Sequence, residues 1–141
     1  MNDPHNLGAI ARTAECTGSA GIIVSERNSA PISPTAIKAS AGALEYLGVA
    51  KCSSSIQTIE TLKENGFWII GTDLDAETLH NQIEYEMPIC LVLGNEGKGL
   101  SKAILKHCDF VIKVPILGKV QSLNVSVSAG VMLYEILSKR K

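Results

Sequence analysis

Two continuous apolar runs constrain the fold of this chain more than any other feature. FWIIGT (residues 67–72) and ICLVLG (89–94) contain almost no polar side chains, and each has about the length of one strand. Runs of this kind are typical of central parallel strands that helices cover on both faces. They therefore predict an α/β fold built on a mostly parallel sheet.

The remaining segments alternate between strand-like and helix-like patterns. Further strands are expected at residues 21–24, 48–52 and 110–115, and helices at 6–17, 33–40, 55–65, 101–108 and from about Asn124 to Lys139. Gly18 and Gly66 are suitable helix stops, and Ser33 is a suitable N-cap. Short loops and the absence of a repeat or linker predict a single domain over residues 1–141.

Composition restricts the function classes. The chain has 13 Lys+Arg against 14 Asp+Glu and lacks the basic excess of an autonomous nucleic-acid binder. Any RNA contact would need a local basic face, a second subunit or another domain. The four cysteines and three histidines lack the spacing of a metal site, and we interpret the cysteines as small core hydrophobes of a cytoplasmic protein. No apolar run is long enough to cross a membrane.

The first candidate site segment is NDPHNLGAIARTAE (2–15). Asn6 and Arg12 are nearly two helical turns apart and could share a face, where a helix start and a cation would favour an anion. An ordinary capped helix with a solvated arginine explains this segment equally well when it is taken alone.

Two further segments each follow an expected strand. LGNEGKGLS (93–101) has glycines that allow close approach of a ligand and presents Glu96, but its order does not match a phosphate-binding P-loop. In 114–130, Ser122 and Asn124 precede a helix and could simply cap it. That helix is apolar on nearly all sides, which favours burial at a subunit interface.

Taken together and in this order, the three segments resemble the signature of the SpoU (TrmH-like) branch of the SPOUT RNA 2′-O-ribose methyltransferases. The pattern N-x-G-x-x-x-R-T-A stands at 6–14, G-x-E-G-x-G at 94–99 and S-L-N-V-S-V at 122–127. KASAGALEY (38–46) also fits the family, and the match covers essentially the whole chain. DPHN (3–6) and HCD (107–109) look closest to bacterial enzymes that methylate a guanosine ribose in large-subunit rRNA.

The resemblance implies a SPOUT fold, in which the helix-flanked parallel sheet ends in a deep C-terminal trefoil knot. It implies S-adenosylmethionine as cofactor, bound in that knot. It further implies a homodimer packed partly through the last helix and a structured RNA partner, with no metal and no membrane. The positions that match the family's cofactor contacts are Thr72, Leu93, Gly94, Val114, Ile116 and Leu123.

The implied reaction is methyl transfer to a ribose 2′-hydroxyl, in which positioning contributes most of the rate. The catalytic positions carried over are Asn6, Arg12, Glu96, Ser122 and Asn124. Because a guanidinium stays protonated, we expect Arg12 to stabilise the developing oxyanion or a nearby phosphate rather than to act as a base.

The match departs from the family at its start. Family members usually have a strand before the first motif, and the rRNA enzymes often add a small N-terminal RNA-binding domain. Since neither is found, we expect a catalytic domain cut from a longer protein.

Two alternative functions remain open, a tRNA ribose methyltransferase and a non-catalytic dimeric relative that binds RNA or cofactor. A Rossmann-type enzyme is excluded because no G-x-G-x-x-G follows the first strand.

Overall fold

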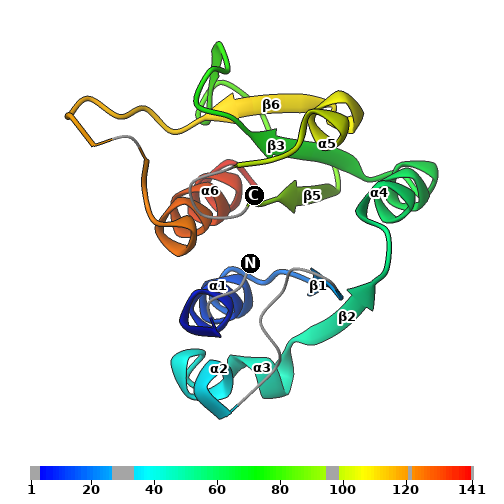
Figure 1. Cartoon of the computed structure of the whole chain (residues 1–141), viewed down its shortest axis with the longest axis vertical. Helices are drawn as coiled ribbons and strands as arrows, with labels where there is room; N and C mark the ends of the chain where they lie inside the picture. The colour runs from blue at the N-terminus through cyan, green and yellow to red at the C-terminus, as the bar shows by residue number, and fades with distance from the viewer. Residues whose placement is uncertain (1–3, 27–33, 95–98, 121, 141) are drawn as a thin grey trace. The chain divides into compact units, whose positions relative to one another are not determined.

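The protein forms two compact units, Met1–Ser53 and Ser54–Lys141, each with its own parallel sheet (Figure 1). The structure is a computed structural model that describes residues 4–26, 34–94, 99–120 and 122–140. Each unit is described by itself below.

The first unit packs three helices with two strands. Their order is α1 (Pro4–Cys16), β1 (Gly21–Ser25), α2 (Pro34–Ala39), α3 (Ala43–Tyr46) and β2 (Gly48–Cys52). The strands pair in parallel, with Gly21 opposite Gly48, and a small core forms around Leu7, Val24 and Ala36. The alanine in this core allows α1 and α2 to pack closely.

The second unit holds the two apolar runs in its sheet. Its elements are α4 (Ser55–Glu64), β3 (Trp68–Thr72), β4 (Thr78–Leu79), β5 (Ile89–Val92), α5 (Lys102–His107), β6 (Phe110–Lys113) and α6 (Val125–Lys139). The strand order is β4-β6-β3-β5, and every pair is parallel. The runs become β3 and β5, which confirms the predicted parallel α/β arrangement.

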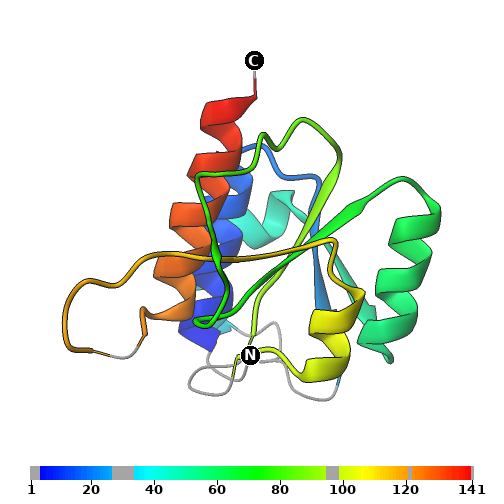
Figure 2. The same ribbon diagram turned by 90° about the horizontal axis from the view of Figure 1, so that it is seen from above.

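Helices cover the two faces of this sheet, with α6 on one side and α4 and α5 on the other (Figure 2). Ile70 points into a buried cluster with Met132 and Ile136 of α6. The next residue, Gly71, faces the opposite way, because side chains alternate along a strand. A Cβ there would lie 2.7 Å from the sulfur of Cys108 and 3.0 Å from Cδ1 of Leu100, so a residue other than glycine would have to displace these two side chains.

Local capping explains why most predicted element ends agree with the structure. Ser54 accepts a hydrogen bond from the Gln57 amide at 3.2 Å to begin α4, and Gly18, with φ of 77°, follows α1. The predicted strand 110–115 instead ends at Lys113, before Pro115, which has no N–H to donate to a ladder. The expected N-cap Ser33 lies outside the described residues.

The sequence analysis missed two short elements, α3 and β4. One expectation is wrong, because Cys16 is exposed and is not a core hydrophobe. The four cysteines are nevertheless all free thiols. Within the described ranges, no helix has both the length and the apolar character needed to cross a bilayer.

Candidate functional site

An open hollow of about 390 Å³ lies at the carboxyl end of β6. Ligands of parallel α/β sheets bind at this end of the strands, and the volume falls within the range of about 300–1,000 Å³ found for small-molecule sites. Two of the predicted cofactor residues, Val114 and Ile116, line it. The other lining residues are Leu74, Leu79, Lys113, Pro115, Leu117, Gly118 and Val120.

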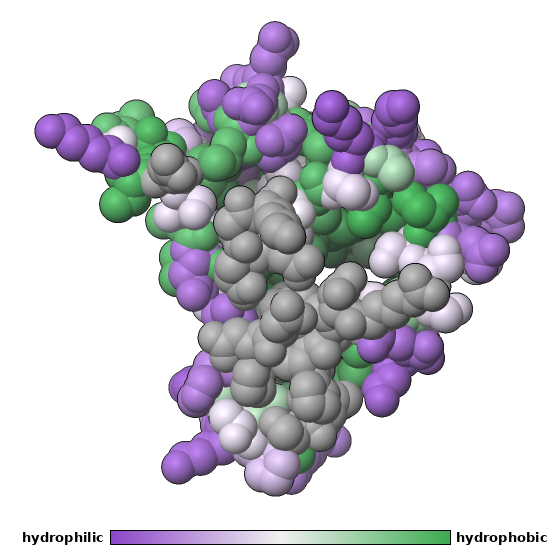
Figure 3. All heavy atoms as spheres, viewed as in Figure 1, coloured by the Kyte–Doolittle hydropathy of each residue, from purple (hydrophilic) through white to green (hydrophobic). Residues whose placement is uncertain are grey.

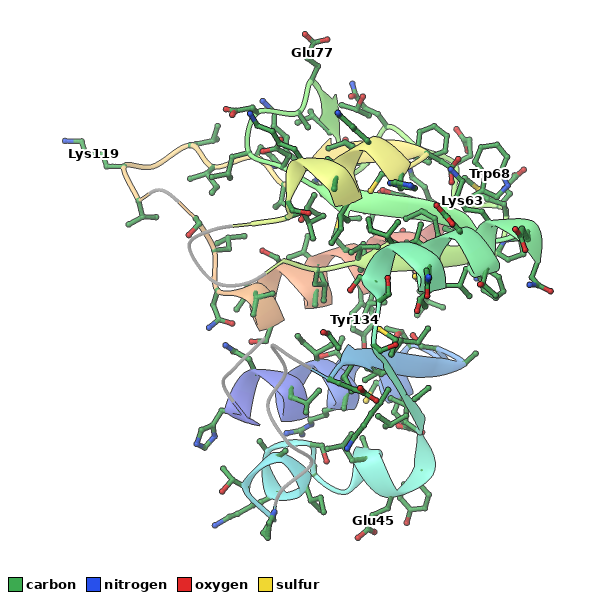
Figure 4. The ribbon with its side chains drawn as sticks, turned by 45° about the vertical axis from the view of Figure 1, so that its right-hand side comes forward. Glu45, Lys63, Trp68, Glu77, Lys119 and Tyr134 are labelled. Atoms are coloured by element: carbon green, nitrogen blue, oxygen red, sulfur yellow. The ribbon has the colours of Figure 1, made fainter. Side chains whose placement is uncertain are left out.

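The outer wall of the hollow is the loop that follows β6. Leu117 and Val120 are 98% and 70% exposed, which is unusual for apolar side chains. Figure 3 shows hydrophobic atoms gathered at this loop, and Figure 4 shows Lys119 pointing away from the body of the unit at its tip. The loop thus offers an apolar surface beside a positive charge.

Three further predicted cofactor residues follow or end neighbouring strands. Thr72 ends β3 and pairs with Ile112 of β6, while Leu93 and Gly94 come directly after β5, which pairs with β3 on its other side. The carboxyl ends of all three strands therefore meet at one edge. None of these residues lines the hollow itself, and neither does Leu123.

In the second motif, the backbone at Gly94 lies close to the backbone at Gly99. A Cβ at this position would lie 2.5 Å from the carbonyl carbon of Gly99, which is shorter than any ordinary contact. Gly99 in turn adopts φ of 66°, a region that favours glycine. Close backbone packing thus explains the glycine at 94, and the backbone conformation explains the glycine at 99, whatever they bind.

The third motif forms the start of α6. Asn124 is the N-cap, and its Oδ1 accepts a hydrogen bond from the Ser126 amide at 2.8 Å. Ser122 and Leu123 precede it and are exposed. The structure therefore assigns Asn124 the capping role that its sequence position allowed, and leaves its Nδ2 amide group as the part that could serve a substrate.

The first motif lies on α1 of the first unit. Asn6 is buried and Arg12 is exposed, so the expectation that they share a face is wrong. Six residues at about 100° each place two side chains roughly 120° apart on a helix. Among the described residues, Arg12 makes no ion pair.

The fifth predicted catalytic residue, Glu96, lies outside the described residues, as do Asn95, Gly97 and Lys98. In the described part of the chain, no group of three or more His, Cys, Asp or Glu side chains could hold a metal ion.

The HCD run (107–109) connects helices and strands of the second unit through hydrogen bonds and an ion pair. Asp109 accepts a hydrogen bond from the Ile69 amide at 2.7 Å and pairs with Lys63 of α4 at 3.6 Å. Lys63 also donates to the carbonyl oxygen of His107 at 3.1 Å. These contacts join α4, α5 and the starts of β3 and β6, so the run needs no role in catalysis to explain it.

Sequence reasoning missed Leu74, Leu79 and Lys113 as lining residues of the hollow. Leu74 follows β3 and Leu79 belongs to the two-residue strand β4, and neither lies in a motif. The available signal was their position: each lies at the carboxyl end of a strand or just beyond it, where a ligand would be expected.

The matching family model identifies the chain. The description of that model is "SpoU rRNA Methylase family", and it covers residues 1–134. The chain belongs to the SpoU rRNA methylase family. The motif resemblance is therefore confirmed.

Individual relatives agree with this assignment. The chain is 44% identical over 140 residues to YacO of Bacillus subtilis (strain 168), whose name places it in the TrmH family of tRNA/rRNA methyltransferases; the alignment covers 99% of this chain and 56% of that protein. The chain thus spans little more than half the length of this relative.

Two solved methyltransferase structures share the fold. The SpoU methyltransferase AviRb from Streptomyces viridochromogenes, crystallised with the cofactor AdoMet, aligns with a TM-score of 0.91 at 27% identity, over 98% of this chain and 56% of that one. An RNA 2′-O ribose methyltransferase aligns with a TM-score of 0.87 at 29% identity, over 99% of this chain and 53% of that one.

Proposed function

We propose that this SpoU-family chain transfers a methyl group from S-adenosylmethionine to a ribose 2′-hydroxyl of RNA, with a guanosine of large-subunit rRNA as the first candidate substrate. The observation that carries the proposal is the hollow at the carboxyl end of β6, whose wall includes Val114 and Ile116, two positions that match the family's cofactor contacts. Support also comes from the ribose methyltransferase of similar fold and from AviRb, which holds AdoMet.

The hollow suits this cofactor chemically. An apolar wall with exposed backbone groups can take up an adenine ring and bind its edge nitrogens, which is how concave sites combine apolar contact with a few polar groups. Val114 and Ile116 would contact the ring, and Leu93, Gly94, Thr72 and Leu123 would complete the site. The bound cofactor would supply a methyl group already activated by its sulfonium and would leave as the neutral thioether, S-adenosylhomocysteine, while the proton of the ribose hydroxyl would pass to solvent.

The residues of the chain would then position and stabilise the substrate. Arg12, which remains protonated, would stabilise the negative charge that develops on the ribose oxygen or would bind a neighbouring phosphate. Asn6, which is buried on a different side of α1 from Arg12, would act through the position of that helix, and Ser122 would bind substrate or cofactor. Glu96 and Asn124 would orient Arg12 and the ribose. Asn124 can do so through its Nδ2 group, since its Oδ1 caps α6.

The proposal includes the architecture of the active form. We propose that residues 1–141 act as one catalytic domain with the C-terminal trefoil knot of the SPOUT fold, in a cytoplasmic homodimer packed through α6. Four exposed apolar side chains support the dimer, because they follow one side of α6 at spacings of four, three and three residues; this α6 stripe consists of Val127, Val131, Tyr134 and Leu137.

The first test combines cofactor binding with methyl transfer. Calorimetric titration of the purified chain with S-adenosylmethionine should show saturable binding, and titration with a nicotinamide dinucleotide should show none. Methyl transfer is then measured on unmodified transcripts of large-subunit rRNA and of tRNA. A ribose 2′-O-methyl group is identified by the resistance of the adjacent phosphodiester to alkali, because alkaline cleavage requires a free 2′-hydroxyl.

The Arg12→Ala variant tests the assigned mechanism. We expect it to reduce methyl transfer by about 10²- to 10³-fold, the usual loss when a group that stabilises a developing oxyanion is removed, while the Kd for S-adenosylmethionine stays unchanged. Arg12→Lys serves as the matched control that keeps the charge and loses the planar donor geometry. Activity of Arg12→Ala near that of the wild type would reject the role of Arg12.

The choice of RNA is tested by the wild-type protein. Methylation of tRNA but not of large-subunit rRNA would identify tRNA as the substrate. Cofactor binding without methyl transfer to either RNA would favour a non-catalytic relative.

A further inference from the structure

The segment between β4 and β5 is held by basic side chains at the end of α6. Lys139 donates from Nζ to the carbonyl oxygen of Ile83 at 2.7 Å, and Arg140 donates from Nε to that of Tyr85 at 3.1 Å. The same two side chains also bind the carbonyl groups of Asn81 and Met87. These carbonyls belong to no strand, so the two cations satisfy acceptors that a loop would otherwise expose.

Tyr85 occupies the centre of this segment in an unusual backbone conformation. Its φ is 57°, in the left-handed region that a bulky residue rarely adopts. Its side chain is fully buried in the cluster that includes Ile112 and Met132, and the Lys139 ammonium lies 5.6 Å from the ring centroid. A glycine would fit this φ more easily, so the tyrosine side chain must contribute something that a glycine could not.

That contribution includes a hydrogen bond back along the chain. The Tyr85 hydroxyl donates to the carbonyl oxygen of His80. Burial, and then the charge of Glu135, raises the pKa of Tyr85 to about 12, so the hydroxyl is a donor throughout the neutral range. The bond therefore closes a turn from His80 to Tyr85.

The turn begins at the wall of the hollow. His80 directly follows Leu79, whose side chain lines the hollow, and the His80 amide donates to the Lys113 carbonyl oxygen at 2.9 Å. The Leu79 amide is bound by Oε1 of Gln82, which lies within the same turn, at 2.8 Å. Because β4 has only two residues, its own ladder is short, and the position of Leu79 depends on the turn that follows it.

We propose that Tyr85 is a positioning residue for the cofactor hollow: its hydroxyl fixes the turn that holds Leu79 in the wall, and Lys139 and Arg140 keep that turn closed. The proposal rests on the function proposed above, since it assumes that the hollow binds S-adenosylmethionine. Tyr85 itself lies in the core and does not line the hollow, so it acts through His80 and Leu79.

The test is Tyr85→Phe, which keeps the buried ring and removes only the hydroxyl. We expect the Kd and the KM for S-adenosylmethionine to rise about two- to tenfold, the range that one intramolecular hydrogen bond supplies, while kcat at saturating cofactor stays at the wild-type value. Hydrogen exchange at the Leu79 and His80 amides should accelerate. Tyr46→Phe, the same deletion at an 81% exposed tyrosine on α3, is the matched control and should change neither constant.

A second variant keeps the proposal testable if Tyr85→Phe folds poorly. Arg140→Met removes one of the two cations from the turn and should weaken cofactor binding in the same direction. Unchanged cofactor affinity in folded Tyr85→Phe or in Arg140→Met, with only a lower melting temperature, would overturn the positioning role. Absence of cofactor binding by the wild type would instead overturn the proposed function together with this inference, so the two failures are distinguishable.

Discussion

Gly8 shows at the scale of one residue why the first motif requires a glycine. A Cβ at this position would lie 2.4 Å from the carbonyl oxygen of Ala36 and 2.6 Å from the Cβ of Ala39. Both neighbours belong to α2, one of them through its rigid backbone, so α1 and α2 would have to separate. The glycine of this motif thus serves helix packing, independently of any ligand.

We therefore expect Gly8→Ala to lower the free energy of unfolding by about 1–3 kcal/mol, as other over-packed sites do. The matched control is Gly48→Ala, since the nearest atom to a Cβ there is the Ala20 carbonyl oxygen at 3.8 Å. Urea denaturation followed by circular dichroism should show a lower midpoint for the first variant only. Equal midpoints would mean that the two helices can separate without loss.

The residues of the candidate site were predictable to different degrees. Val114 and Ile116 followed from the resemblance to the family, whose cofactor contacts match positions at the end of the expected strand 110–115 and just after it. Leu74 and Leu79 were not predictable, because they reach the same hollow from other parts of the chain and carry no chemical signature. The prediction that Asn6 and Arg12 share a face of α1 was wrong for a simpler reason. Two residues six positions apart do not lie on the same side of a helix.

Element boundaries were predicted well wherever a local cap determines them. Ser54, Gly18 and Asn124 lie at helix ends that the sequence indicated, and each acts through its own backbone or side chain. The elements that were missed, α3 with four residues and β4 with two, are too short to show a period. Strand β4 exists because β6 lies beside it, which no local pattern reveals.

The two roles of Asn124 can be separated at the level of α6. Asn124→Ala should lower the stability by about 1 kcal/mol, the usual effect of losing an N-cap. Asn124→Asp keeps an acceptor for the Ser126 amide and places a negative charge at the helix start, so its stability should match that of the wild type. If the Nδ2 group serves the reaction as proposed, Asn124→Asp should still lose methyl transfer. Full activity in the aspartate variant would restrict Asn124 to capping.

The dimer proposed above depends on the α6 stripe. Figure 4 shows Tyr134 on the side of α6 away from the sheet, and the buried residues Ala129, Met132 and Ile136 lie on the other side. A helix that packs its inner face against the sheet and keeps an apolar outer face fits an interface between two copies.

We expect Val131→Arg, in the centre of the α6 stripe, to shift the dimer to monomers in sedimentation velocity without unfolding the chain, because a buried unpaired charge strongly disfavours an interface. Tyr46→Arg, on α3, serves as the control for adding a charge at an exposed aromatic position. A dimer that persists in Val131→Arg would place the interface on another surface.

The order of strands in the second unit has a consequence for biosynthesis. Strand β3 is central, and one of its two partners, β6, follows about forty residues later in the chain. During translation β3 therefore emerges long before β6 can pair with it, and contacts between distant residues form slowly because a long loop must close first. Until then the strand with the most buried residues has an unpaired edge, which makes the nascent chain a natural client of factors that shield such edges from aggregation.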